Sequence, residues 1–124
     1  MIAVGDHYLG QTPEVLLRAS CPFGGGLGGG REELCGVLSG GALILGALWG
    51  RTTPAENDEA LRALARRFRA WFLGRYGSAQ CNAIRSQLPE MDKRCGPVVE
   101  EGARALVEMM EAMRGQRDCS ASLR

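Results

Sequence analysis

An uncharged, glycine-containing stretch, residues 34–50, sets the tightest limit on how this chain can fold. It is shorter than the roughly 20 residues that a membrane-spanning helix needs. A helix here is apolar nearly all round, so we expect it at the centre of a domain, from residue 31 or 32 to about 49. Four glycines fall within this helix: Gly36, Gly40, Gly41 and Gly46. Each costs about 1 kcal/mol of helix propensity relative to alanine. We expect close packing of neighbouring backbones to offset that cost.

Capping signals and helical periodicity predict four further helices. One begins at Thr12-Pro13-Glu14 and stops near residue 20, and another begins at the capping box Thr53 to Glu56 and ends at Gly77. A short helix follows Ser78, and the last runs from Pro97 to Gly115. Apolar residues at helical spacing predict which side chains face the core: Leu61, Leu64, Ala65, Phe68, Trp71 and Phe72 in the helix that ends at Gly77, and Val99, Ala103, Leu106, Met110 and Met113 in the last. No alternating β-pattern is present. The sequence therefore predicts an all-α fold.

We expect a single domain, a compact bundle of about five helices with its core over residues 12–115. A glycine-rich loop, residues 24–30, joins the first and second of these helices, and residues 116–124 form a flexible tail.

The charge balance excludes several classes of partner. Lys and Arg total 15 against 14 for Asp and Glu, and aromatic residues make up only 6%. Neither nucleic acid nor an acidic membrane surface is therefore expected as a partner. No signal peptide is visible, so we expect a cytoplasmic protein. In that reducing compartment, an odd number of cysteines is typical of metal binding, thiol chemistry or burial rather than a disulfide framework.

The cysteines are the strongest candidates for chemistry. No Cys-x-x-Cys pair occurs, but three of the five fall at predicted helix starts, where the helix dipole favours the thiolate: Cys35, Cys81 and Cys95. The alternative is that these cysteines are small buried apolar side chains, which is common. Spacing alone leaves both interpretations open.

The glycine-rich loop contains the pattern Gly24-x-Gly26-x-x-Gly29 and leads into a helix. Such loops can bind phosphate through backbone N–H groups, but no strand precedes this one and no Lys-Ser/Thr follows. We interpret it as a loop that lets the chain or a cofactor approach closely, with Gly24, Gly25 and Gly26 as candidate cofactor-contacting residues.

These segments together resemble the C-GCAxxG-C-C redox-active family. The resemblance rests on Phe23 to Gly28, on Cys35-Gly36-Val37-Leu38-Ser39-Gly40-Gly41, and on the lone cysteines Cys81 and Cys95. It covers roughly residues 10–113. It implies a helical domain whose cysteines converge on a redox centre, and a related domain of split-Soret cytochromes implies an iron–sulfur cluster.

Carried over by position, the resemblance implies that Cys35, Cys81 and Cys95 are ligands or redox thiols. The family's first cysteine is replaced by Thr12, so Cys21 is the best candidate for a fourth metal ligand and Cys119 a weaker one. Without a fourth thiol, the site binds metal through three thiolates and water, binds zinc instead of a cluster, or binds nothing.

Three functional hypotheses follow. The first is a cysteine-based redox or metal-binding protein, specifically an iron–sulfur carrier or electron-transfer protein that acts with a redox partner protein. The second is a thiol–disulfide switch or enzyme in which Cys35 attacks and Cys81 or Cys95 resolves. The third is a helical interaction module that has lost its redox centre and forms a homodimer through its glycine-rich and methionine-rich helices.

Overall fold

The computed structural model describes residues 1–122 and contains six α-helices and no β-strand in that part of the chain, which confirms the all-α prediction. The helices are α1 (Ile2–Leu9), α2 (Glu14–Ser20), α3 (Gly36–Trp49), α4 (Glu59–Tyr76), α5 (Cys81–Arg85) and α6 (Gly96–Ser122). Three short 3-10 turns join them at Cys21–Phe23, Leu27–Gly29 and Glu90–Asp92. None of the described helices is both long enough and apolar enough to cross a bilayer.

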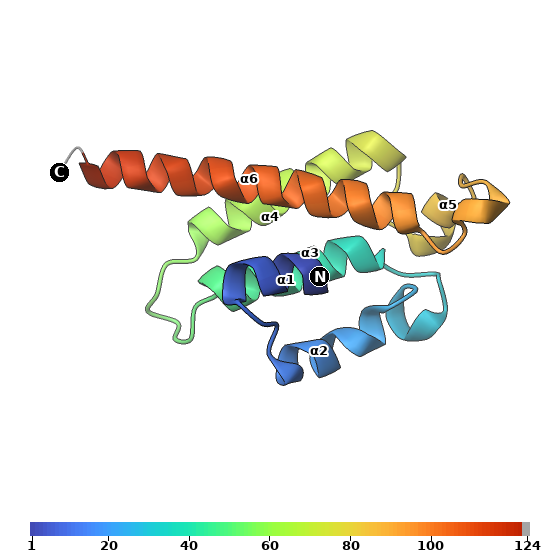
Figure 1. Ribbon diagram of the computed structural model, residues 1–124, viewed down its shortest axis with the longest axis horizontal. Coiled ribbons are helices and arrows are strands. Elements are labelled where there is room, and N and C mark those ends of the chain that lie inside the picture. Colours follow the sequence, from blue (N-terminus) through green and yellow to red (C-terminus); the bar gives the residue numbers. More distant parts are fainter. Residues whose placement is uncertain (123–124) are drawn as a thin grey trace.

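The apolar helix α3 is the centre of the fold, as its sequence predicts. It contacts α4 and α6, which also contact each other, and α1 and α2 cover its remaining side (Figure 1). Ile44 and Leu45 of α3 are fully buried, and they pack in one core with Phe72 of α4 and Met110 of α6.

Close helix packing occurs at a glycine of α3. A Cβ atom added to Gly41 would lie 2.6 Å from Cε1 of the buried Phe68 and 3.4 Å from Cδ2 of Leu106. The absence of a side chain at this position is therefore what lets α4 and α6 approach α3 together. The helix propensity lost at Gly41 is offset by this packing.

Several predicted helix boundaries are wrong, each for a reason that lies outside the local sequence. Helix α2 begins at Glu14 without a Thr12 cap, because the Thr12 hydroxyl donates to Oδ1 of Asp6 at 2.7 Å. Helix α4 begins at Glu59 rather than Thr53. The Thr52 and Thr53 hydroxyls do bond to Oε1 of Glu56, but they close a turn ahead of the helix.

At the two ends of the chain the structure also differs from the prediction. The sequence did not predict α1, a short helix with Gly5 in its middle that packs against α3. The glycine-rich segment therefore joins the second and third helices, not the first and second, and Leu27–Gly29 within it forms a 3-10 turn. Helix α6 continues past Gly115 to Ser122. Residues 123–124 of the predicted tail lie outside the described residues.

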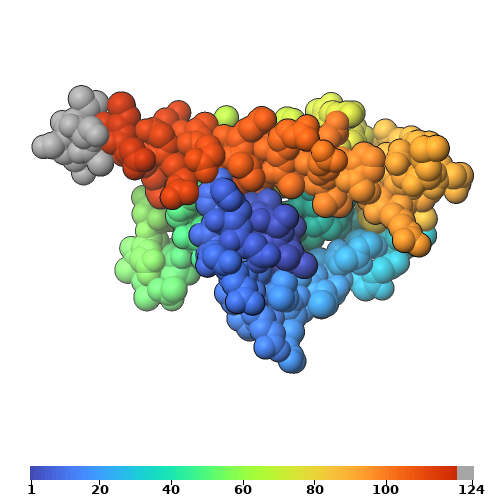
Figure 2. Space-filling view, viewed as in Figure 1, coloured from blue at the N-terminus to red at the C-terminus, as the bar shows by residue number. Residues whose placement is uncertain are grey.

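The inward faces of α4 and α6 follow their periodicity with one exception. Leu64, Phe68 and Phe72 are buried as predicted, and so are Leu106 and Met110. At the start of α6, however, Val98 is 1% exposed and the predicted core residue Val99 is 48% exposed. Val99 instead lines a cavity together with Gly24 and Gly25. In Figure 2, orange atoms near the start of α6 lie beside light-blue atoms of the segment that follows α2.

Replacing Gly41 by alanine should destabilise the fold by about 1–3 kcal/mol, because the added methyl group overpacks the contact with Phe68. Urea unfolding measures this. The matched control is Gly46→Ala on the same helix, where an added Cβ meets nothing within 4 Å and should stabilise by about 0.5–1 kcal/mol. Equal effects of the two substitutions would contradict the close-packing argument.

Candidate functional site

Three cysteines line one cavity at the end of the bundle where α3, α5 and α6 begin. The cavity has a volume of about 390 Å³, and Cys35, Cys81 and Cys95 all contribute to its wall. In Figure 1 this end lies opposite the C-terminus. The cysteines come from three separate segments of the chain, so only the tertiary fold brings them together.

A short backbone pairing fixes Cys35 relative to Cys81. Leu34 and Gln80 form an isolated antiparallel bridge. On its two sides, the Cys35 N–H donates to the Ala79 carbonyl at 2.8 Å and the Cys81 N–H donates to the Glu33 carbonyl at 2.9 Å. Side chains alternate along extended chain, so the residues that follow the bridge on each segment lie on the same face. This pairing also explains why α3 starts at Gly36 rather than at residue 31.

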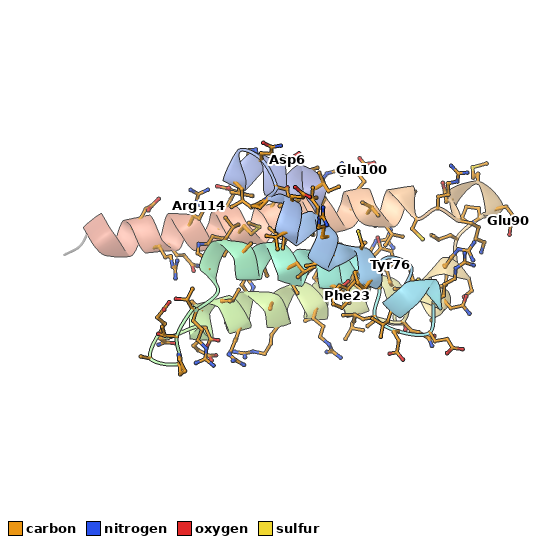
Figure 3. The ribbon with its side chains drawn as sticks, turned by 90° about the horizontal axis from the view of Figure 1, so that it is seen from below. Asp6, Phe23, Tyr76, Glu90, Glu100 and Arg114 are labelled. Atoms are coloured by element: carbon orange, nitrogen blue, oxygen red, sulfur yellow. The ribbon has the colours of Figure 1, made fainter. Side chains whose placement is uncertain are left out.

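Reciprocal hydrogen bonds hold the third cysteine in place. The Arg85 Nε donates to the Lys93 carbonyl at 2.9 Å, and the Lys93 Nζ donates to the Arg85 carbonyl at 2.8 Å. These bonds fold the loop after α5 back onto that helix, and Glu90 lies at its outer end in Figure 3. The Cys95 N–H then donates to the Asp92 carbonyl at 2.7 Å, directly before α6.

Backbone strain is concentrated at this cavity. In the described part of the chain, Arg31 (φ 62°) and Cys95 (φ 63°) are the two residues other than glycine with positive φ, and both line the cavity. A non-glycine residue in this conformation costs about 1–3 kcal/mol, and such residues cluster at functional sites. Their shared position therefore supports a functional role for the cavity.

The glycine-rich segment forms another wall of the cavity. Gly24 and Gly25 line it, whereas Gly26 is buried behind them. The Arg31 N–H donates to the Gly25 carbonyl at 2.9 Å, and a Cβ on Gly26 would lie 3.2 Å from Cα of Arg31. The glycines thus let the segment close tightly on itself beside the thiols.

Burial keeps two of the thiols protonated. It raises the pKa of Cys35, and the nearby Cys81 and Cys95 raise it further, although the backbone N–H groups of Val37 and Leu38 oppose this. The pKa of Cys81 is also raised, first by burial and then by Cys95, while Arg31 and Arg85 act in the opposite direction. The expected lowering of thiol pKa at helix starts is therefore outweighed by desolvation and by the neighbouring thiols.

The remaining candidate residues lie away from the cavity wall. Cys21 is exposed and its thiol donates to the Leu17 carbonyl at 3.4 Å, and Cys119 is exposed far along α6. Thr12 is 3% exposed, and its N–H and hydroxyl donate to Asp6, which links α1 to the start of α2. The structure brings together Cys35, Cys81 and Cys95, and it does not bring Cys21 to them.

Within residues 1–122, no group of three or more His, Cys, Asp or Glu side chains is arranged to hold a single metal ion. A tetrahedral zinc site would need thiolate sulfurs about 2.3 Å from one point. The cavity is also much larger than one ion. What the cavity offers is three cysteine side chains on one wall, without the close convergence of a single-ion site.

The positive charge of the site is not predicted by the sequence. Four cationic side chains line the cavity: Arg31, Arg85, Lys93 and Arg94. The adjacency of Lys93 and Arg94 to Cys95 is the one local signal that indicated it. The other two come from the segment before α3 and from α5, and no spacing in the sequence connects them.

Comparison with known proteins bears directly on the cysteine pattern. No curated protein and no solved structure matches the chain. Residues 1–109 match the family described as "Putative redox-active protein (C_GCAxxG_C_C)". Since this match covers most of the chain and includes all three cavity cysteines, the resemblance drawn from the sequence is confirmed: the chain belongs to the C_GCAxxG_C_C family.

Proposed function

We propose that this chain is an electron-transfer protein whose redox centre is an iron–sulfur cluster held by Cys35, Cys81 and Cys95. The main support is that three cysteines from distant segments of the chain line a single cavity. Burial of single thiols does not require that three cysteines from separate segments line one cavity. A redox partner protein would exchange electrons with this centre.

The donor set and its surroundings fit such a group. Iron–sulfur clusters are held by cysteine thiolates, and hydrogen bonds, net charge and solvent exposure set their potentials. When bound, a cluster supplies one-electron transfer. The chain contributes three thiolates, four nearby cations that offset their negative charge, and the glycine wall that shields one side. A fourth ligand would come from outside the cavity wall, because Cys21 does not line it.

Protein purified without oxygen should contain iron and acid-labile sulfide, with a visible charge-transfer band. Cys35→Ser, Cys81→Ser and Cys95→Ser should each lower the iron content at least several-fold, because each removes one of three thiolate ligands. Cys119→Ser is the matched control and should retain it. Cys21→Ser tests the remaining candidate ligand, and retention there is expected.

Circular dichroism checks that each variant is folded. Absence of iron and sulfide from folded wild-type protein, even after reconstitution, would remove the cluster from this proposal.

The same cavity favours a second candidate, a thiol–disulfide switch between Cys81 and Cys95. The charges of these two thiols interact, and Cys95 is the more accessible of them. Formation of a disulfide would release two electrons and two protons to an external oxidant such as a small disulfide. The raised pKa of Cys81 slows attack at neutral pH, so this candidate ranks below the first.

The pH dependence of alkylation separates the two candidates. In metal-free protein, the rates of iodoacetamide reaction at Cys35 and Cys81 should still rise with pH above about 8.5, the ordinary pKa of a thiol. Peptide mass spectrometry measures each rate. A plateau below pH 8 at either residue would instead favour the switch.

The same raised pKa values link pH to stability. Thiols in the unfolded chain ionise first, so the free energy of unfolding should fall as pH rises through about 8.5 towards the folded pKa values. At more than about 1.5 pH units below 8.5, these two groups should contribute almost no slope. The Cys35→Ser/Cys81→Ser double variant should lose this alkaline slope in urea unfolding. An unchanged slope would show that other groups cause it.

A further inference from the structure

The cavity around the three thiols is positively charged on its own wall. Arg31, Arg85, Lys93 and Arg94 line it, and no Asp or Glu of the described residues does so. This charge is local, because the whole chain has a formal net charge of only +1. Positive charge is therefore concentrated at the cavity, and the remaining residues bring the net charge of the chain close to zero.

None of these four cations forms an ion pair with a carboxylate in residues 1–122. Elsewhere in that part of the chain, arginines pair with acids within 4 Å, as Arg62 does with Asp58 and Arg75 with Glu101. At the cavity, the side chains of Arg85 and Lys93 each donate to the other's backbone carbonyl. No carboxylate side chain of the described residues therefore neutralises the positive charge of the cavity.

The cations occupy two depths. Arg85 and Lys93 are half-buried and held by their reciprocal hydrogen bonds, whereas Arg31 and Arg94 are exposed. The exposed pair can attract an anion from solvent, and the fixed inner pair can hold it beside the thiols. Guanidinium groups suit carboxylates and phosphates because their planar N–H donors match two oxygens at once.

The size of the cavity limits its occupant. A volume of about 390 Å³ lies in the range of small-molecule sites. We propose that this cavity binds small oligoanions, molecules with two or more carboxylate or phosphate groups, directly beside Cys81 and Cys95. This inference rests on the proposed redox function, and it identifies small anions as the class of molecule that reacts at the site.

Paired alkylating reagents test the proposal. Iodoacetate and iodoacetamide have nearly the same size and displace the same iodide from carbon to form a thioether, but only iodoacetate is anionic. In the reduced, metal-free, full-length chain at low salt, the iodoacetate-to-iodoacetamide rate ratio at Cys95 should exceed that at Cys21 by about tenfold. Both cysteines are measured in one sample by peptide mass spectrometry, and Cys119 gives a second reference outside the cavity.

Charge variants identify the source of the preference. Arg31→Gln/Arg94→Gln should lower the ratio at Cys95 several-fold, and about 0.5 M salt should do the same to the wild type. The matched control is Arg67→Gln, an exposed arginine of α4 that does not line the cavity, and it should change nothing. The wild-type comparison between Cys95 and Cys21 stands even where a variant fails to fold.

Direct binding provides the second measurement. Citrate and pyrophosphate are tested separately at matched ionic strength, so that a carboxylate ligand is distinguished from a phosphate ligand. At least one of them should bind with a dissociation constant at least about fivefold lower than that of chloride. Equal ratios at Cys95 and Cys21, together with no binding of either anion, would overturn this inference. If that result came from protein that contains iron and sulfide, the proposed redox centre would still hold and only the anion site would be wrong. If the protein showed the anion preference but contained no iron, only the cluster proposal would be wrong.

Discussion

The close packing of α3 against α4 and α6 is the contact on which the rest of the structure depends. Gly41 allows it, because any side chain there would overlap Phe68. Because α3, α4 and α6 all pack against one another, each fixes the positions of the other two. The starts of α3 and α6 therefore lie at the same end of the bundle, together with α5, which follows the end of α4 (Figure 1). The cavity forms where these helix starts meet.

The parts of the fold that sequence predicts well are those set by burial within one helix. The apolar spacing of α4 places Leu64, Phe68 and Phe72 in the core, and the uncharged run around Ile44 identifies the central helix. Helix ends are less predictable because contacts between distant segments decide them. The first turn expected of α3 is lost to pairing with residues 79–82, and the Thr12 hydroxyl is used by Asp6.

The candidate site, like the fold, is only partly predictable from the sequence. The sequence indicates which cysteines precede helices, and the family resemblance indicates which of them act together. Their convergence depends on the Leu34–Gln80 bridge and on the Arg85–Lys93 hydrogen bonds, and neither leaves a periodic signal in the sequence. The positive wall of the cavity was missed for the same reason, since its cations come from three segments that read as ordinary solvated surface.

The Leu34–Gln80 bridge also has a consequence for how the protein matures. It joins segments that are separated by all of α3 and α4, so its loop-closure entropy must be overcome before Cys35 and Cys81 face each other. A nascent or unfolded chain therefore lacks the thiol arrangement, and any group that binds it binds the native state alone. Such binding adds to the free energy of unfolding. Loss of the bound group would then shorten the lifetime of the folded chain as well as end its chemistry.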